Sequence, residues 1–415
     1  MHIDLLSLRL HTILAHLFVF AYLNLHIARK EHVSGYFFEL DLCPNVTYRY
    51  CRTKEGTMGK NVVVWGTGNV GRPAIRSVVA NKDLDLVGVL VQNPEKIGKD
   101  AGDLAGIENT GITATDDISI ALENEIDAVV YTVNADFRPI ESLDEVENLL
   151  RNGKNVVTTS FYPLYHPPSM PEDLAERFSS ACNEGNASIF ASGIDPGWTC
   201  DILPLLLAGV SADITEIRSR ELMNYALYDQ PEAVRNLVGF GMPMDQTPPM
   251  VLDFSMQMVW GPEIRILADG LGVELEEIRT HVEKRALEKT VTVEGMGDFD
   301  EGTIGALRFE IQGIVNGKPM LVMEHVTRID DDCAPDWPYP SSGQGVHQVE
   351  ITGKPNLSVT VHGEEHGERG AAGGGNGTAA NRIVNAIPAV CAAPAGVLHP
   401  LDVTPLNIGA QFKNS

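Results

Sequence analysis

The most specific chemical signal in the sequence is a G-x-G-x-x-G pattern formed by Gly66, Gly68 and Gly71. It follows the apolar run 61–65 and precedes a segment whose apolar residues recur with helical spacing, which is the context of a dinucleotide-binding turn. Such a turn lets the backbone approach a pyrophosphate, while the following helix offers N–H groups to the phosphates. A glycine turn that binds nothing is the alternative. We predict nucleotide contacts from Gly66, Thr67, Gly68, Asn69, Val70 and Gly71.

The residues after a second apolar run, 84–91, bear on which dinucleotide binds. NAD-specific enzymes usually carry an acidic residue here, which accepts a hydrogen bond from the ribose 2′-hydroxyl. This sequence instead has Gln92 and Asn93, followed by Lys96, and these side chains can donate to a phosphate. A solvated loop lysine is the alternative. The pattern therefore predicts NAD(P) as the cofactor and tilts the prediction toward NADP.

Hydride transfer to or from a nicotinamide needs a proton donor or a charge partner beside the reacting heteroatom. Side chains that could supply one follow predicted strands or lie in the turn 193–201, which leads out of the nucleotide-binding segment. Asn134 and Thr159, at the ends of two predicted strands, are expected near the nicotinamide ring. The catalytic set that we predict is Tyr162, Glu221, Tyr225 and Asp195.

Each of these candidates has an ordinary structural role as its alternative. A tyrosine at a strand end commonly packs with a hydrated hydroxyl. Asp195 can cap the helix that follows it, and Glu221 can face solvent from a strand. His325 and His347 show no ligand spacing, so we predict no metal site.

The elements that must position these residues alternate regularly from residue 60 onward. Apolar runs typical of strands alternate with segments of helical periodicity, which predicts a parallel, doubly wound sheet with its ligand at the carboxyl ends of the strands. The predicted strands are 61–65, 84–91, 126–133, 155–159 and 187–191. The predicted helices are 73–80, 116–124, 139–151 and 171–184.

The pattern changes after the turn 193–201. A strand at 214–223 and helices near 232–238 and 249–271 precede four extended stretches, which predicts an α+β domain with a mainly antiparallel sheet. Asn316-Gly317 between two of these stretches is a strong hairpin signal. The extended stretches are 281–292, 305–315, 320–329 and 348–362.

These patterns predict an α/β protein with two domains. We expect a Rossmann-type domain at 58–194 and an α+β domain at 195–405, followed by a tail at 406–415. The α+β domain would contain a mobile glycine-rich loop at 363–377 and end in an apolar helix at 379–393.

Residues 1–57 do not resemble the rest of the chain. They contain an apolar run at 13–28, which is interrupted by polar residues and is short for a membrane span. Met58 stands directly before the first predicted strand. We interpret 1–57 as a start-site extension or a disordered appendage, and a weak membrane anchor is the alternative.

Composition limits the classes of partner. The chain has 415 residues, of which 44% are hydrophobic and 21% charged, as in ordinary globular proteins. Its formal net charge of −25 argues against nucleic acid as a partner. Six cysteines without C-x-x-C spacing indicate reduced thiols, and therefore a cytoplasmic protein. The predicted hydride transfer implies a small-molecule substrate.

Several blocks resemble a known family. The segment 62–194, including Asp100 to Ile107, resembles the nucleotide domain of dihydrodipicolinate reductase. Residues 60–405 are similar to the related group that includes 2,4-diaminopentanoate dehydrogenase and the native amine dehydrogenases. The resemblance implies an NAD(P)-dependent oxidoreductase that transfers hydride to or from a small imine, amine or carbonyl substrate, as a homodimer. The blocks that carry it are 66–71, 155–159, 193–201, 239–243 and 385–390.

Three alternatives stay open at this point. The chain could be an authentic dihydrodipicolinate reductase of lysine biosynthesis. It could be an NAD(P)-binding sensor that has lost the chemistry, or a redox protein tethered to a membrane by residues 1–57.

Overall fold

The computed structural model describes residues 59–403, apart from 229, 342–344 and 366–369. The expected extension or anchor at 1–57 and the tail at 406–415 lie outside the described residues. Within the part that is described, no helix is long and apolar enough to cross a membrane.

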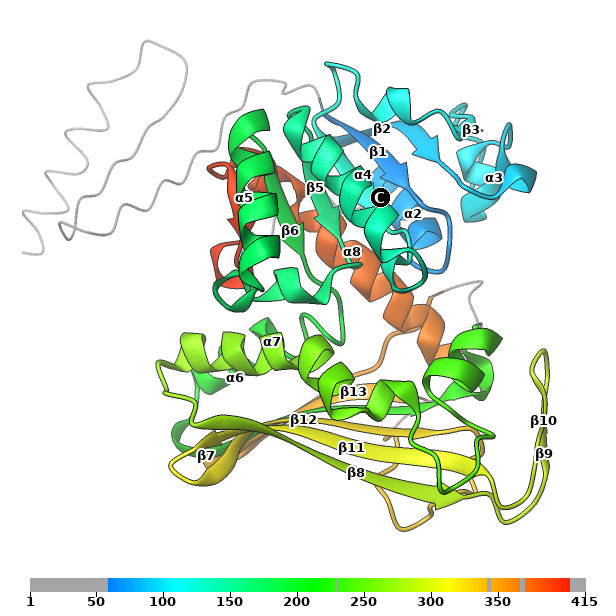
Figure 1. Ribbon diagram of the computed structural model, residues 1–415, viewed down its shortest axis with the longest axis vertical. Coiled ribbons are helices and arrows are strands. Elements are labelled where there is room, and N and C mark those ends of the chain that lie inside the picture. Colours follow the sequence, from blue (N-terminus) through cyan, green and yellow to red (C-terminus); the bar gives the residue numbers. More distant parts are fainter. Residues whose placement is uncertain (1–58, 229, 342–344, 366–369, 404–415) are drawn as a thin grey trace, which may run out of the picture. The chain divides into compact units, whose positions relative to one another are not determined.

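The predicted doubly wound sheet is confirmed (Figure 1). In the described residues it has seven strands in the order β15-β6-β5-β4-β1-β2-β3, and every neighbouring pair is parallel. The crossover from β1 to β2 runs through α2, which begins at the glycine turn. The strands are β1 Lys60–Trp65, β2 Leu84–Leu90, β3 Ala114–Thr115, β4 Ala128–Tyr131, β5 Asn155–Thr158, β6 Ser188–Ala191 and β15 Gly396–Leu398.

Helices cover both faces of this sheet, which explains why its strands are apolar without interruption. On β1, Val62 and Val64 belong to a core shared with α2 and α8, while Val63 and Trp65 belong to a core shared with α4 and α5. The glycine turn follows β1 at the carboxyl edge. The helices are α2 Gly71–Ala80, α3 Ala101–Ala105, α4 Pro139–Arg151, α5 Glu172–Gly185 and α8 Gly370–Ala392.

The second sheet has six strands in the described residues, in the order β14-β13-β7-β12-β11-β8. All pairs are antiparallel except β7 with β12, as the α+β prediction required. Asn316 and Gly317 form the predicted hairpin turn with φ of 53° and 72°. The strands are β7 Ala212–Asn224, β8 Glu277–Ala286, β11 Ile304–Val315, β12 Lys318–Arg328, β13 Gly345–Lys354 and β14 Leu357–Val361.

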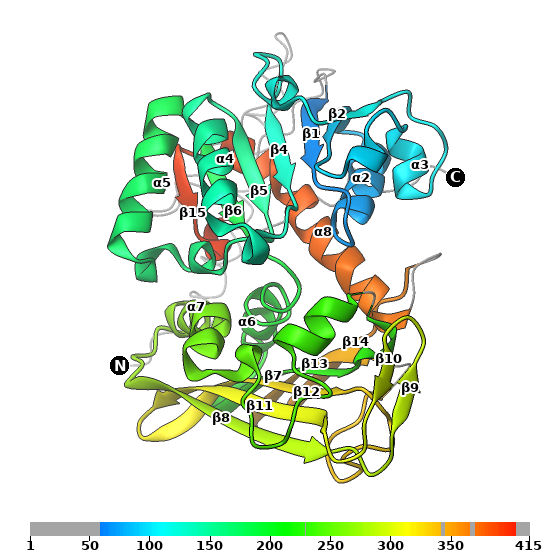
Figure 2. The same cartoon turned by 45° about the vertical axis from the view of Figure 1, so that its right-hand side comes forward.

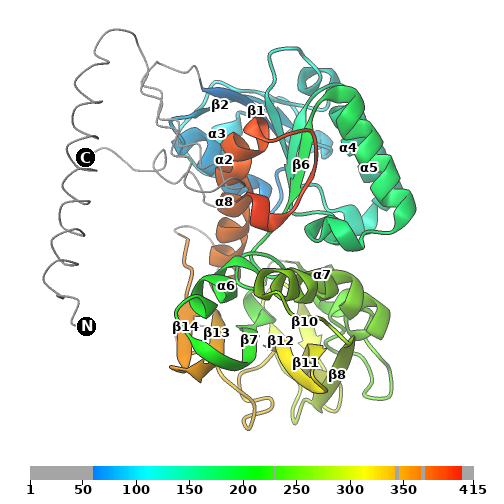
Figure 3. The same cartoon turned by 90° about the vertical axis from the view of Figure 1, so that its left-hand side faces the viewer.

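One face of the second sheet, here called the inner face, is covered by α6 (Ile202–Ala208) and α7 (Asp253–Leu271) (Figure 3). Trp260 and Ile264 of α7 pack with side chains from β7, β11 and β12 in one apolar core. A separate hairpin, β9 (Val291–Val293) with β10 (Gly297–Phe299), adjoins this domain. The inner face is therefore a dry core in which any charged side chain needs a partner.

The prediction of a glycine-rich loop at 363–377 is wrong from residue 370 onward, because α8 begins at Gly370. Glycine usually weakens a helix, but here it permits close packing. A Cβ atom at Gly374 would collide with the carbonyl oxygen of Gly363, and one at Gly377 with the carboxylate of Glu365. Only glycine lets the start of α8 approach the segment before it.

The C-terminal segment also differs from the expected domain boundaries (Figure 2). We assigned 195–405 to the second domain, but β15 pairs with β6 of the first sheet and α8 packs against α2, β5 and β6. The apolar residues Ile383 and Ile387 of α8 lie in the same core as Val62 of β1. The nucleotide domain is therefore assembled from both ends of the described chain.

Candidate active site

A cavity of about 660 Å³ lies at the carboxyl ends of the first sheet and is closed on the other side by β7, β13 and the segment after β7. Both domains and the start of α8 line it. One end of the cavity is formed by the turn after β1 and is the predicted nucleotide site. The other end could hold a small substrate.

The glycine turn has the geometry that a pyrophosphate requires. Gly66 has a φ of 109°, and a Cβ atom at Gly71 would collide with the carbonyl oxygen of Gly66, so the turn is tight. A Cβ atom at Gly68 would meet nothing within 4 Å, which leaves its side of the turn open to the cavity. Of the predicted turn residues, 66–70 line the cavity, and Gly71 supports them from behind.

The other predicted cofactor residues line the same cavity. They are Gln92, Asn93, Asn134 and Thr159. Lys96 joins them because its Nζ donates to the carbonyl oxygen of Thr67 at 2.8 Å and lies 3.1 Å from that residue's Oγ1. Burial, together with the nearby charges of Arg72 and Lys99, lowers the pKa of Lys96. Three cationic side chains therefore converge near the end of β2.

All four predicted catalytic residues line the cavity: Tyr162, Asp195, Glu221 and Tyr225. The alternative role for Asp195 as a helix cap does not hold, because Asp201 caps α6. Asp195 instead accepts a hydrogen bond of 2.8 Å from Trp260 Nε1. Tyr162 is half-buried, and its burial together with the charge of Asp136 raises its pKa.

Glu221 does not face solvent either. It lies on the inner face of β7, where its side chain is 10% exposed. Its Oε1 accepts a hydrogen bond of 2.8 Å from the hydroxyl of Tyr225, whose pKa is raised by burial and then by Glu221. The carboxylate therefore has one neutral donor and needs charged partners to stay ionised in this dry environment.

Two histidines lie beside Glu221, and sequence reasoning missed both. His325 on β12 and His347 on β13 are the cross-strand neighbours of Glu221. His325 Nδ1 lies 3.6 Å from Glu221 Oε1 and its Nε2 lies 3.2 Å from Asp195 Oδ1, while His347 Nε2 lies 3.6 Å from Glu221 Oε2. One imidazole thus bridges the two carboxylates.

The pKa values follow from this arrangement. Burial alone would lower the pKa of His325, but Asp195 and Glu221 outweigh it and raise the value to about 10. Burial alone would raise the pKa of both carboxyl groups, yet His325 holds each of them below its usual range, with help from His347. At neutral pH the bridge consists of two carboxylates and one imidazolium, and it carries one net negative charge.

No arginine and no lysine other than Lys96 lines the cavity within the described chain, and Lys96 lies at the nucleotide end. The imidazolium of His325 contacts both Asp195 and Glu221, and the imidazole of His347 also faces Glu221. A cationic group bound beside them would complete the balance, whereas a carboxylate on the ligand would find no counter-charge.

The prediction that the chain binds no metal stays a prediction. Asp195, Glu221 and His347 have potential ligand atoms within 4.8 Å of one another, but the two carboxylates are already paired with the imidazolium of His325. A second group in the described residues joins His166, Asp269 and His399. There, His399 Nδ1 accepts a hydrogen bond from the Leu401 amide, so Nε2 carries the proton and offers no lone pair.

Comparison with known proteins agrees with the geometry. Residues 60–163 match the family described as dihydrodipicolinate reductase, N-terminus, and residues 198–414 match the 2,4-diaminopentanoate dehydrogenase C-terminal domain. An amine dehydrogenase from Streptomyces virginiae is 48% identical over 345 residues, which cover 83% of this chain and 96% of that protein.

More distant relatives share the fold. A 2,4-diaminopentanoate dehydrogenase from Acetoanaerobium sticklandii is 22% identical over 363 residues, covering 85% of this chain and 96% of that one. The structure of an amine dehydrogenase from Mycobacterium smegmatis has a TM-score of 0.65 at 21% identity, covering 86% of this chain and 99% of that one. The chain therefore belongs to the dihydrodipicolinate reductase-like family of NAD(P)-dependent oxidoreductases, with a C-terminal domain of the 2,4-diaminopentanoate dehydrogenase type.

Proposed function

We propose that the protein is an amine dehydrogenase, which interconverts a small primary amine and the corresponding carbonyl compound plus ammonia. The observation that carries this proposal is the buried bridge of Asp195, His325 and Glu221, whose net negative charge fits an ammonium or iminium group. The 48% identity to an amine dehydrogenase over most of both chains supports the same reaction.

The bound nicotinamide supplies the hydride acceptor, and the protein supplies binding, proton transfer and exclusion of water. In the oxidative direction, the substrate ammonium binds beside Glu221 and Asp195 and loses one proton to Glu221. The C–H bond then breaks with transfer of hydride, and the nitrogen lone pair forms the C=N bond of an iminium ion. Water adds to its carbon, and ammonia leaves to give the carbonyl product.

The two tyrosines have distinct proposed roles. Tyr225 donates to Glu221 Oε1 at 2.8 Å, which orients the carboxylate toward the cavity. Tyr162 lines the cavity from the nucleotide domain, and its raised pKa keeps its hydroxyl protonated as a donor to the carbonyl or carbinolamine oxygen.

The far wall of the cavity is apolar. The residues that form it come from the segment after β7 and from the turn before α7. They are Ala233, Leu237, Val238 and Met250. We infer that this wall receives the hydrocarbon substituents of the amine, and that an amino acid is a poor substrate because its carboxylate has no counter-charge there.

We propose NADP as the preferred cofactor. Lys96, Arg72 and Lys99 are close enough for their charges to lower the pKa of Lys96, and a 2′-phosphate would relieve this repulsion. Gln92 and Asn93 line the cavity at the same point and offer neutral donors. Removing the Lys96 charge is the direct test.

The reaction is tested with the purified full chain. NADPH and NADH are titrated first. The reduction of NAD(P)⁺ is then followed with short-chain primary amines, amino acids and 2,4-diaminopentanoate, and the oxidation of NAD(P)H with dihydrodipicolinate. Turnover of plain amines supports the proposal. Turnover of dihydrodipicolinate alone would make the chain an authentic reductase of that substrate, and nucleotide binding without any turnover would make it a sensor.

We also propose a homodimer that pairs through the outer face of the second sheet, the face opposite α6 and α7. That face carries arginines and glutamates side by side, such as Arg220 and Glu350, so it can complement a second copy of itself across a two-fold axis. Light scattering should give about twice the chain mass of 45.1 kDa. A monomer would contradict this proposal without touching the reaction.

We further propose a cytoplasmic location. The cysteines that the structure describes, Cys182, Cys200, Cys333 and Cys391, are free thiols, which fits a reducing compartment. Fractionation of cells that express the chain from its own start tests this, and recovery in the membrane fraction would support an anchor instead.

A further inference from the structure

We propose that His325 is a positioning residue held as a charged imidazolium, and that it fixes the charge and geometry of the amine site by bridging Asp195 and Glu221. The inference rests on the proposed function, because it assigns a role within that site. His325 does not line the cavity, so it acts through the two carboxylates that do.

The bridge is built from three separate parts of the chain. Asp195 lies in the turn between the domains, Glu221 on β7, and His325 on β12. His325 Nε2 lies 3.2 Å from Asp195 Oδ1, and its Nδ1 lies 3.6 Å from Glu221 Oε1. Because each ring nitrogen faces a carboxylate, each must carry a proton to make the contact attractive, and an imidazole with two N–H groups is a cation.

The faces of the same ring are enclosed by aromatic side chains. Phe309 stacks on His325 with ring centroids 4.7 Å apart and an interplanar angle of 8°. Trp260 approaches edge-on at 4.6 Å, and its Nε1 donates to Asp195. The aromatic rings exclude water from the bridge, and the π face of Phe309 stabilises the positive charge. The two carboxylates therefore hold the edges of the imidazolium ring by charge, and the aromatic side chains hold its faces by packing.

Other titratable groups face the bridge from each neighbouring element. His347 of β13 approaches Glu221 at 3.6 Å. Tyr225 donates to Glu221, Cys200 donates to Asp195, and Glu263 of α7 lies near Asp195. Burial, followed by the charges of Asp201 and Asp195, raises the pKa of Glu263 well above its usual value. Among these neighbours, His325 is the one whose ring contacts both Asp195 and Glu221.

This arrangement has a consequence for the substrate. With His325 charged, the site holds one unbalanced negative charge and fits one ammonium group. Without that cation, two carboxylates would share a buried site, and one of them would take up a proton at neutral pH. The proton acceptor would then be partly occupied before the amine arrives.

The first test measures the charge of His325 directly. The full chain is labelled with ¹⁵N-histidine, and the resonances of His325 are identified by their absence from His325→Gln. We expect both ring nitrogens to be protonated at about pH 8.5, where an ordinary histidine is neutral. A neutral imidazole at that pH would overturn the proposal. If His325→Gln fails to fold, Asp195→Asn identifies the resonances, because it changes the partner of the His325 ring.

The second test uses the kinetics. In His325→Gln we expect kcat/KM for a primary amine to fall about tenfold at neutral pH, and the acidic limb of its pH profile to move up by about one unit, while NADPH binds as before. The matched control is Thr327→Val, which changes a buried residue two positions along the same strand whose hydroxyl makes no hydrogen bond in the described structure.

The outcomes separate the two proposals. His325→Gln could lose activity equally at every pH, with the acidic limb of its profile unchanged, or Thr327→Val could lose as much activity as His325→Gln. Either result would mean that His325 is only a packing residue. If the wild-type chain turns over no amine, the proposed function fails, while the ¹⁵N measurement still decides the charge of His325.

Discussion

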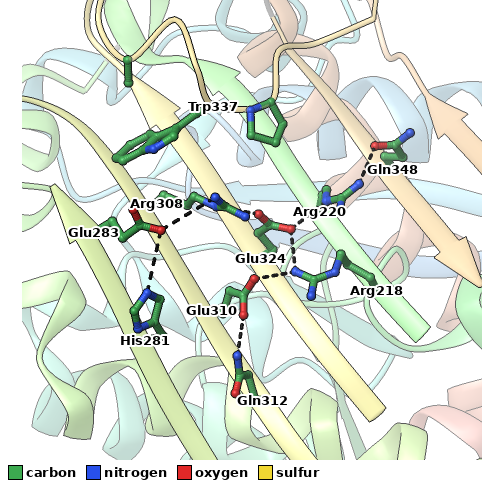
Figure 4. A network of polar contacts seen from close by, with 12 residues as sticks. Arg218, Arg220, His281, Glu283, Arg308, Glu310, Gln312, Glu324, Trp337 and Gln348 are labelled. Carbon is green, nitrogen blue, oxygen red and sulfur yellow. Dashed lines mark hydrogen bonds and ion pairs between the residues drawn. The ribbon is translucent and has the colours of Figure 1, made fainter. Parts of the chain in front are cut away.

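The two faces of the second sheet carry charged residues in neighbouring positions, but the charges are balanced differently on each face. On β7 and β12, Arg220 lies beside Glu324 on the outer face, and one residue further along, Glu221 lies beside His325 on the inner face. On the outer face, Glu324 is fully buried and contacts three arginines, Arg218, Arg220 and Arg308, at 2.7, 2.7 and 2.8 Å (Figure 4).

The outer network satisfies itself, because each carboxylate there meets guanidinium groups of the same chain. The inner bridge is left with one negative charge in excess and opens onto a cavity. Both clusters are buried and strongly paired, so these two properties do not separate a binding site from a structural network. The comparison shows that a charged cluster is a candidate site when its charges are not balanced and it borders a cavity.

The strongest test of this distinction is Glu221→Gln. It removes the excess charge and the proton acceptor while keeping the shape of the side chain. We expect kcat/KM for a primary amine to fall by about 10²- to 10⁴-fold, with NADPH affinity unchanged. The matched control is Glu350→Gln on the outer face of β13, which should keep wild-type kinetics. Equal effects of the two changes would contradict the comparison.

The corresponding change on the outer face is Glu324→Gln. It leaves three arginines without their central carboxylate, so we expect the free energy of unfolding to fall by about 3 kcal/mol, with kcat of the folded enzyme retained. Denaturant titration measures the free energy of unfolding, and assays at low temperature measure kcat. The exposed pair of Glu277 with Arg279 provides the control, since Glu277→Gln should cost less than about 1 kcal/mol.

A third prediction concerns the cation at the nucleotide end of the cavity. Lys96→Ala should weaken NADPH binding about tenfold, because a charge-assisted contact to the 2′-phosphate is lost, and should change NADH binding little. Lys82→Ala, which alters an exposed lysine just before the start of β2, serves as the control. If both nucleotides lose affinity equally, Lys96 only supports the glycine turn through Thr67.

The smallest expected effect is a pH dependence of stability. The pKa of His325 is raised to about 10 in the folded state, so the stability that its charge contributes is fully present below the unfolded value of about 6.5 and is lost as the pH rises through about 10. The melting temperature should therefore decline between about pH 6.5 and 10, and His325→Gln should lack this part of the decline. The outer arginines stay charged over that range, so they contribute no such slope.

Much of the architecture could be predicted because local sequence patterns determine it. The apolar runs that alternate with helical segments indicated the parallel sheet, and Asn316-Gly317 indicated the hairpin. The predicted catalytic residues Asp195 and Glu221 were accessible to the same logic, since strand ends and interdomain turns meet at the edge of a doubly wound sheet.

His325 and His347 could not be found in this way. Their importance depends on the register of β12 and β13 against β7, which brings residues about 100 positions apart onto one row. The local signal was a histidine within a predicted strand, and it did not stand out because both strands also contain other polar and charged residues. The helical start of α8 was missed for a similar reason, because Gly374 is helical only through its close contact with Gly363.

The return of β15 to the first sheet has a consequence for biosynthesis. The glycine turn is made long before the helix and the strand that complete its domain. While the roughly 300 residues between the turn and α8 are synthesised, the core around β1, β5 and β6 lacks the side chains of α8. The nascent chain therefore cannot present a finished nucleotide-binding domain, and acquisition of the cofactor is deferred until α8 and β15 have been made.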